Sequence, residues 1–240
     1  MRYYPAFLNL QGLGCLVVGG GQVGERKVKT LLSCGAKVHL ISLELTSSLE
    51  EEVRQGHVRL LAPEFLPEHL EGMFLVIGAT DDPEVNQRIS LEARSRNLLC
   101  NIVDKPRECN FIVPSQVHRG DLVIAVSTGG RSPALAKKIR QDLENLFPDI
   151  YSSYVALLGR VREYLLAQGL PQAKNQQIFE SLIEAPILES IQKGDREELT
   201  NQLIRLLDPP PRLKEVEGWL REMDGGLKVP PRFAAGAREA

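Results

Sequence analysis

Short apolar runs alternate with amphipathic segments over roughly the first hundred residues of the chain. The apolar runs are too short for helices and are typical of buried strands; they lie at 14–18, 36–41, 58–61, 73–79 and 98–103. Between them, apolar residues recur at helical spacing, at 22–33, 46–55 and from 82 onward. Strands that alternate with helices imply right-handed crossovers, so this pattern predicts a parallel sheet covered by helices on both faces.

The ends of these helices carry their own local signals. Gly35 follows the first helix, where a glycine commonly ends a helix in a left-handed conformation. Thr46 is a suitable N-cap for the second helix, and Asp82-Pro83 places a capping residue and a first-position proline at the start of the third.

The alternation of strands and helices ends after Asp104. Two short strands at 111–115 and 122–127 flank a turn at 118–121, which predicts an antiparallel hairpin. Ser132-Pro133 then opens a helix that Pro148 ends. Further helices are expected at 151–168, 172–183, 186–192 and 196–207. The Pro-rich stretch 208–211 stops this pattern, a short helix at 213–223 is compatible with the sequence, and the remainder to residue 240 has the composition of a tail.

Composition narrows the class of protein. The 240 residues carry a net charge of -2, which argues against a general affinity for nucleic acid or acidic lipid. No apolar run approaches the roughly 18–20 residues of a membrane span, and the first residues lack the apolar core and cleavage site of a signal peptide. The four cysteines and four histidines show no metal-ligand spacing, so no metal site is predicted and a reducing cytoplasm is the expected location.

A glycine-rich loop follows the first strand. Residues 19–24 match G-x-G-x-x-G at Gly19, Gly21 and Gly24, with Gln22 and Val23 between the last two glycines. The first glycine allows a tight turn, the second lets the backbone approach a pyrophosphate, and the third lets helix and strand pack closely. Because the motif follows a buried strand and opens a helix, it predicts a dinucleotide-binding Rossmann-type domain. The alternative is a glycine turn that binds nothing.

The end of the second strand bears on the choice of cofactor. Many NAD-binding domains have an acidic residue at this strand end, which binds the ribose. Here Ser42 occupies that position, and the nearest acidic residue, Glu44, follows two residues later. No arginine stands at this strand end to favour the 2′-phosphate of NADP, so NAD is predicted. The loop after the fourth strand, which includes Thr80 and Asp81, is expected to line the same crevice.

A second group of polar residues begins where the fifth strand ends. Asn101 and Asp104 lie on the expected cofactor side, where an aspartate can act as a general base; the alternative is a turn or helix cap. Ser127, Thr128 and Gly129 precede a helix start and can form a nest of backbone N–H groups for a carboxylate or phosphate.

Basic charge is concentrated in the same part of the chain. Between residues 104 and 140 there are seven basic and three acidic residues, a net charge of +4, so the rest of the chain carries -6. Lys105 and Arg131 are among these cations. A solvated helix face accounts for some of them, and the alternative is a cleft for a polyanionic substrate.

Five segments together resemble one enzyme family. They are the glycine loop to Lys27, Gly78–Asp82 with Val85-Asn86, Asn101–Asp104, Phe111–Ser115 and Val126–Ala134. In this order, from about residue 3 to 150, they resemble precorrin-2 dehydrogenase, the dehydrogenase and ferrochelatase module of sirohaem synthases.

The resemblance implies a reaction and a site. NAD+ would take a hydride from precorrin-2, a tetrapyrrole with eight carboxylates, to give sirohydrochlorin, with Asp104 as the proton acceptor. It implies cofactor contacts from Gly19, Gly21, Gln22, Val23, Gly24, Ser42, Thr80 and Asp81, and substrate contacts from Asn101, Lys105, Ser127, Thr128, Gly129 and Arg131. Some members also insert ferrous iron into sirohydrochlorin, and no residue here decides that second activity.

The resemblance also implies how the chain is organised. It predicts an NAD-binding Rossmann domain at 1–111, a small α+β region at 112–150 that joins two subunits in a homodimer, an all-helical domain at 151–208 and a tail at 209–240 that is expected to be flexible. The competing function is a non-catalytic, NAD-sensing Rossmann module, which needs the glycine loop but no base beside the nicotinamide.

Overall fold

The computed structural model describes residues 3–226, so residues 1–2 and 227–240, which include the end of the predicted tail, lie outside the described residues. The chain divides into two compact units, with the boundary between Val113 and Pro114. Each unit is described by itself.

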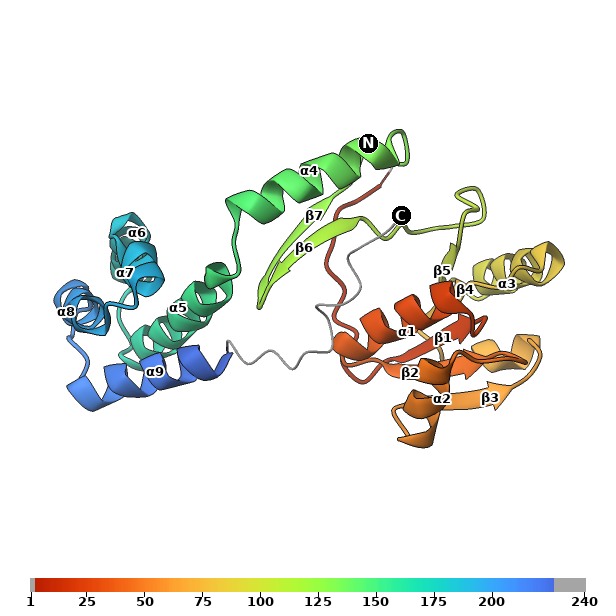
Figure 1. Cartoon of the computed structure of the whole chain (residues 1–240), viewed down its shortest axis with the longest axis horizontal. Coiled ribbons are helices and arrows are strands. Elements are labelled where there is room, and N and C mark those ends of the chain that lie inside the picture. The colour runs from red at the N-terminus through yellow and green to blue at the C-terminus, as the bar shows by residue number, and fades with distance from the viewer. Residues whose placement is uncertain (1–2, 227–240) are drawn as a thin grey trace. The chain divides into compact units, whose positions relative to one another are not determined.

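The first unit is built on a five-stranded parallel sheet in the order β3-β2-β1-β4-β5 (Figure 1). Its strands are β1 (Gly14–Val18), β2 (Lys37–Ile41), β3 (Val58–Ala62), β4 (Leu75–Gly78) and β5 (Leu99–Ile102). The helices between them are α1 (Gln22–Ser33), α2 (Ser47–Arg54), α3 (Pro83–Ser95) and the 3-10 turn η1 (Pro67–Leu70). The predicted alternation of strands and helices, and with it the Rossmann-type fold, is confirmed.

Two apolar clusters hold this sheet between its helices. Val28 and Leu31 of α1 and Leu49 of α2 pack with one face of the sheet. Ile89 and Ala93 of α3 pack with the opposite face. Strands buried on both faces require near-continuous apolar runs, which is the pattern seen in the sequence.

The predicted helix starts are present. The Thr46 side chain accepts a hydrogen bond from the backbone N–H of Leu49 at the start of α2. The Asp82 side chain accepts from the N–H groups of Glu84 and Val85 at the start of α3. These caps place the first turns of both helices at the carboxyl edge of the sheet.

The open edge of β5 is covered by the segment that follows it. The amide N–H of Cys100 donates to Oδ1 of Asn110 at 2.8 Å, and the N–H of Asn110 donates back to the Cys100 carbonyl at 3.0 Å. Cys109 lies against Ile102 in the same way, with its Sγ 3.2 Å from the Ile102 nitrogen. The chain therefore folds back along the sheet before it leaves the first unit.

The second unit begins with an antiparallel hairpin, β6 (Ser115–Arg119) and β7 (Leu122–Val126), followed by α4 (Pro133–Leu146). The predicted strand at 111–115 is wrong in position, because β6 starts at Ser115 and runs to Arg119. Pro114 has no N–H to donate to a β-ladder, so the strand starts after it. The turn is also shorter than the predicted 118–121: it consists of Gly120 and Asp121, and Gly120 has a φ of 58°.

Arg119 joins the hairpin to α4. Its Nε donates to the carbonyl of Phe147 at 2.6 Å and its Nη2 to that of Glu144 at 3.2 Å, which satisfies carbonyl groups at the end of α4. It also pairs with Asp149 at 3.2 Å.

Up to residue 226, the second unit continues with five helices: α5 (Ile150–Ala167), α6 (Gln172–Glu184), α7 (Ile187–Lys193), α8 (Arg196–Leu206) and α9 (Leu213–Gly226). Their apolar faces form one core that includes Leu157, Leu182, Leu199 and Val216. The prediction of a tail from residue 209 is wrong for residues 213–226, because α9 contributes Val216, Leu220 and Met223 to this core. None of the helices within residues 3–226 is long and apolar enough to cross a membrane.

The first testable consequence concerns Glu25 of α1, which accepts a hydrogen bond from the Thr46 hydroxyl and pairs with Lys29. Burial raises the pKa of this carboxyl, but hydrogen bonds from Lys29 and Thr46 outweigh it and leave the pKa below its usual value. A depressed pKa stabilises the fold at neutral pH, and this contribution is lost as pH falls through the folded-state pKa. We expect Glu25→Gln to lower the free energy of unfolding by about 1 kcal/mol at pH 7 and by less near pH 3, measured by urea denaturation.

Glu50, an exposed residue of α2, supplies the matched control as Glu50→Gln. A difference between wild type and Glu25→Gln that stays constant over this pH range contradicts the role of the Glu25 carboxylate.

Candidate functional site

The loops after β1, β4 and β5 begin level with one another at the carboxyl edge of the sheet. Val18 pairs with Gly78, and Gly78 pairs with Ile102. The strand order reverses between β1 and β4, and in open parallel sheets of this kind ligands bind in the crevice at that reversal. The glycine loop, the Thr80–Asp81 loop and Asp104 therefore border one crevice.

Two of the predicted glycines are required by the packing around them. A Cβ on Gly19 would lie 2.3 Å from the Ala79 carbonyl oxygen, and Gly19 has a φ of 114°. A Cβ on Gly24 would lie 1.9 Å from the carbonyl oxygen of Gly19. Both separations are far below a van der Waals contact, so only glycine lets the loop pass between β4 and the start of α1.

Gly21 differs from its neighbours. A Cβ built on it would meet no atom of the protein within 4 Å. Gly21 is also the N-cap of α1, and no side chain caps this helix. Open space therefore lies beside the first-turn N–H groups of α1, which belong to Gln22, Val23 and Gly24. These groups stand at the positive end of the helix dipole, and this arrangement binds a pyrophosphate. The residues present fit a dinucleotide.

Gly20 is a loop residue that the motif does not specify. A Cβ on it would lie 2.4 Å from the Glu44 carbonyl oxygen. Its N–H donates to the Ser42 hydroxyl at 2.9 Å, its carbonyl accepts from the N–H of Thr46 at 3.1 Å, and the Ser42 hydroxyl donates to the Glu44 carbonyl at 2.7 Å. Ser42, predicted as a cofactor contact, supports the glycine loop from the second strand. In the sequence, the run of three glycines at 19–21 is the one feature that indicates the close approach of Gly20 to the segment after β2.

Asn86 supports the loop after β4; it belongs to the segments that carry the resemblance but is not among the predicted site residues. Asn86 is only 6% exposed and donates from Nδ2 to the Thr80 carbonyl at 2.7 Å. The Thr80 hydroxyl accepts from the N–H of Asp82 at 3.1 Å. An asparagine on the otherwise apolar face of a predicted helix was the available signal for this role.

Asp104 has an unusual backbone. Its φ is 58°, one of two positive values among the described non-glycine residues, and its side chain is exposed at the crevice. Aspartate and asparagine tolerate this conformation better than other residues with a Cβ, but it still costs free energy. Such positions gather at functional sites, where the surrounding structure imposes them.

The other candidates on the first unit have mixed roles. Asn101 donates from Nδ2 to the Phe111 carbonyl at 3.2 Å, so its amide anchors the segment that leaves the sheet. Lys105 is exposed immediately after Asp104, and its N–H closes the turn by donating to Ile102 at 3.2 Å.

The remaining candidates form the loop between β7 and α4 in the second unit. The Thr128 hydroxyl donates to the Ser132 carbonyl and accepts from the Ser132 N–H, both at 3.0 Å. The Ser127 hydroxyl accepts from the N–H of Gly129 at 3.1 Å, and Arg131 is exposed. Thr128 thus closes the loop on itself, while Gly129, with a φ of 62°, leaves open space where a Cβ would stand.

Part of the basic charge at 104–140 is neutralised within the second unit. Lys138 pairs with Asp142, Arg140 with Glu144 and Arg119 with Asp149. Within residues 3–226, the basic residues of this stretch outside any ion pair are Lys105, Arg107, Arg131 and Lys137.

A metal site requires several ligating side chains in one place. Within residues 3–226, no three or more His, Cys, Asp or Glu side chains come together in a way that could hold a metal ion.

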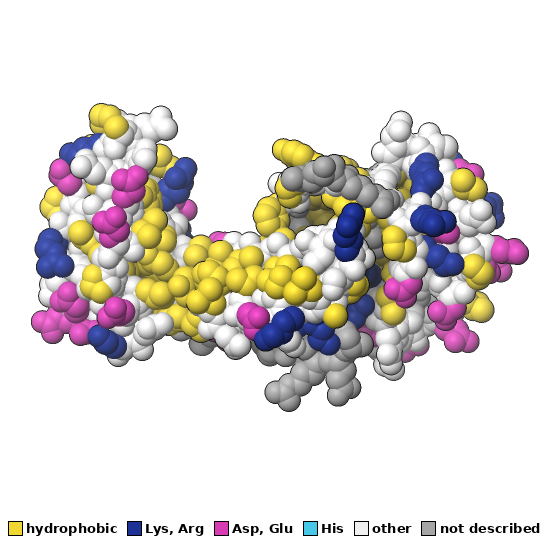
Figure 2. Space-filling model, turned by 90° about the horizontal axis from the view of Figure 1, so that it is seen from above, with side chains coloured by type: hydrophobic (Ala, Val, Ile, Leu, Met, Phe, Trp, Pro, Cys, Tyr) yellow, Lys and Arg dark blue, Asp and Glu magenta, His cyan; other side chains and the backbone are white. Residues whose placement is uncertain are grey.

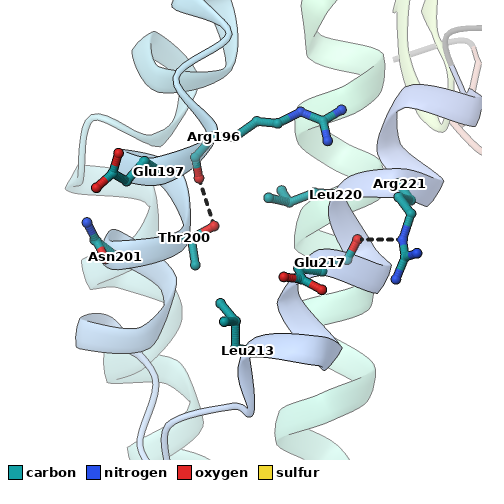
Figure 3. Close-up of a pocket in the computed structure, with 8 residues that line it drawn as sticks. All are labelled: Arg196, Glu197, Thr200, Asn201, Leu213, Glu217, Leu220 and Arg221. Carbon is teal, nitrogen blue, oxygen red and sulfur yellow. Dashed lines mark hydrogen bonds between the residues drawn. The ribbon is translucent and has the colours of Figure 1, made fainter.

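A cavity of about 560 Å³ lies in the helical part of the second unit, between α8 and α9 (Figure 3). Its lining side chains are Arg196, Glu197, Thr200, Asn201, Leu213, Glu217, Leu220 and Arg221. The two arginines balance the two glutamates, and none of the predicted site residues lies there. The Thr200 hydroxyl and the Arg221 Nε donate to carbonyls of their own helices.

Comparisons with known proteins show that the chain is similar in sequence to sirohaem synthases. Residues 6–115 match a family model described as "Putative NAD(P)-binding", and residues 119–146 match one described as "Sirohaem biosynthesis protein central". A sirohaem synthase of Methylobacillus flagellatus is 39% identical over 221 residues, which are 92% of this chain and 47% of that protein. A sirohaem synthase of Nitrosomonas eutropha is 37% identical over 88% of this chain and 45% of its own length.

A solved structure named SirC, precorrin-2 dehydrogenase, has the same fold. Its TM-score is 0.70 at 23% identity, over 93% of this chain and all of that one. The chain therefore has the fold of that protein and spans about half the length of the curated relatives it matches.

The geometry of the glycine loop leads to a second prediction. Gly21→Asp would place a carboxylate beside the open N-terminus of α1, where the pyrophosphate is expected. Juxtaposed like charges cost several kcal/mol, so we expect the affinity for NAD+, measured by fluorescence titration, to fall about a hundredfold or more.

The control is Gly159→Asp in α5, where a new side chain also meets open space. Wild-type affinity for NAD+ in a folded Gly21→Asp protein rules out the glycine loop as the pyrophosphate site.

Proposed function

Because the chain belongs to the sirohaem synthase family over the length it shares with these relatives, we propose that it is an NAD-dependent precorrin-2 dehydrogenase that forms sirohydrochlorin. The observation that carries this proposal is Asp104, an exposed carboxylate in a left-handed backbone conformation at the same sheet edge as the glycine loop. A module that only senses NAD has no use for a base at this position.

The chemistry divides between cofactor and protein. Bound NAD+ supplies the hydride acceptor. The N–H groups of Gln22, Val23 and Gly24 would hold its pyrophosphate, and Gly21 gives it room to approach. Oxidation of precorrin-2 releases one hydride and one proton, and a carboxylate oxygen of Asp104 would accept the proton.

The end of β2 favours NAD over NADP. The Ser42 hydroxyl is engaged by the Gly20 N–H and the Glu44 carbonyl, and the next residues, Leu43 and Glu44, are exposed. No basic side chain follows the strand to pair with a 2′-phosphate, and the Glu44 carboxylate would repel one.

The substrate follows from charge and from the family. Precorrin-2 carries eight carboxylates. Lys105 in the first unit and Arg131 in the second are each an exposed cation on a loop that is predicted to contact the substrate, which supports this proposal. Insertion of ferrous iron as a second substrate stays a prediction from the resemblance alone. We place no step of it on a particular residue.

The central test is Asp104→Asn. Asparagine tolerates the left-handed backbone at this position, so the variant removes the base with little strain. We expect unchanged NAD+ affinity and a 100- to 10,000-fold slower formation of sirohydrochlorin, since this is roughly what a positioned base contributes. The assay follows the absorption of sirohydrochlorin made from enzymatically prepared precorrin-2. Turnover close to that of the wild type in this variant contradicts the assignment of Asp104.

We propose further that the hairpin and α4 form a homodimer interface. Leu135, Ile139 and Leu146 of α4 are 51%, 36% and 65% exposed, and Ala136 is the only residue of this helix that is buried. Hydrophobic side chains gather in a continuous band on the face shown in Figure 2. Apolar side chains left exposed along one side of a helix favour a partner there, and the family resemblance, which predicts a subunit contact at 112–150, supports this interface.

Light scattering at micromolar concentration should therefore give about twice the 26.7 kDa of one chain. Ile139→Glu should shift the protein toward the monomer, because it buries a charge in the interface. The control is Ile183→Glu on the exposed surface of α6. A monomeric wild type, or a dimer that Ile139→Glu leaves intact, contradicts this interface.

A further inference from the structure

Lys27 is a cation on the sheet-facing side of α1. Gly24, Val28 and Leu31 of this helix are buried, and Lys27 lies three residues after Gly24 and one before Val28. Its side chain is half-buried for this reason, whereas the neighbouring Arg26 is exposed. A half-buried ammonium costs free energy unless an anion or a set of acceptors compensates it.

No ion pair or hydrogen bond provides this compensation within the described part of the chain. Among residues 3–226, no carboxylate oxygen lies within 4.0 Å of the Lys27 ammonium, and the ammonium donates no hydrogen bond. Lys29, two residues further along the helix, is paired with Glu25. The fold therefore holds the Lys27 ammonium in a half-buried position without an ion-pair partner among the described residues.

The surroundings of Lys27 place it near the proposed base. Burial lowers the pKa of the Lys27 ammonium, Arg26 lowers it further, and the Asp104 carboxylate opposes them by raising it. Val103, the residue before Asp104, packs against the same apolar cluster as Val28 of α1. Asp104 is therefore a charged group that acts on the Lys27 ammonium without forming an ion pair with it.

We propose that the Lys27 ammonium binds a carboxylate of the tetrapyrrole and so holds the reacting ring beside Asp104. This inference rests on the proposed function and adds a residue of the first unit that positions the substrate. An incoming carboxylate supplies the anionic partner that Lys27 lacks in the free protein, and a charge-assisted hydrogen bond forms between them. Lysine is a compact point charge with three donors, which suits a single carboxylate in a narrow space.

The kinetic test compares Lys27→Met with Lys27→Arg. We expect Lys27→Met to raise the KM for precorrin-2 about 10- to 100-fold, with kcat and NAD+ affinity little changed, because one charged hydrogen bond is lost on binding. Lys27→Arg restores most of the loss. Lys29→Met is the matched control on the same helix and should keep the wild-type KM. A wild-type KM in a folded Lys27→Met protein overturns the inference.

The pH dependence gives a signature that a merely structural role would not. The charged groups that act on Lys27 are Arg26 on α1 and Asp104 after β5. Because only the ammonium binds a carboxylate and its pKa is lowered in the free protein, the KM of the wild type should rise on the alkaline side. This rise should be absent in Lys27→Met and shifted to higher pH in Lys27→Arg. An identical alkaline profile in all three proteins contradicts the proposal.

A labelling experiment separates this inference from the proposed activity. Lys27 is acetylated with acetic anhydride, in the presence of sirohydrochlorin or of NAD+, and its modification is measured by mass spectrometry. Protection by sirohydrochlorin alone supports the tetrapyrrole carboxylate, even if the wild type fails to oxidise precorrin-2 and the proposed function is wrong. Protection by NAD+ alone, or by neither, overturns the assignment.

Discussion

The approach of backbone to backbone at the end of β1 is the constraint on which the rest of the first unit depends. The carbonyl oxygen of Gly19 lies 1.9 Å from where a Cβ of Gly24 would stand, and the carbonyl oxygen of Ala79 lies 2.3 Å from where a Cβ of Gly19 would stand. Because these side chains are absent, α1 starts directly over the strand and the loop after β4 closes against it. The N-terminus of α1 is consequently aimed into the crevice at the strand reversal, and its uncapped N–H groups are available to an anion.

Much of this arrangement could be predicted because it is encoded in local pattern. The apolar runs and the glycine spacing give the strands, the first helix and the cofactor loop without knowledge of any distant contact. The supporting contacts could not be found in this way. The bond from Gly20 to Ser42 joins residues 22 positions apart, and the role of Asn86 depends on a carbonyl that only the folded loop presents.

Predictions after residue 110 were weaker for a related reason. Pro114 shifts the first strand of the hairpin, because a residue without an N–H cannot extend the ladder. The glycines and prolines near the C-terminus predict a tail, but Val216, Leu220 and Met223 recur at helical spacing and are buried in the core that α5 and its neighbours form. Two of the three basic residues on α4, Lys138 and Arg140, form ion pairs with acidic residues of the same helix. The net charge of residues 104–140 therefore overstates the positive charge that is free to bind a ligand.

The central claim is that the crevice at the end of β1, β4 and β5 transfers a hydride from precorrin-2 to NAD+. The most direct measurement is the stoichiometry of a limited turnover, in which purified protein, precorrin-2 and NAD+ are mixed without metal and the absorptions of NADH and sirohydrochlorin are followed together. We expect the two products to form at the same rate and in equal amounts. Sirohydrochlorin that forms without NADH, or no faster than in the absence of protein, would contradict it.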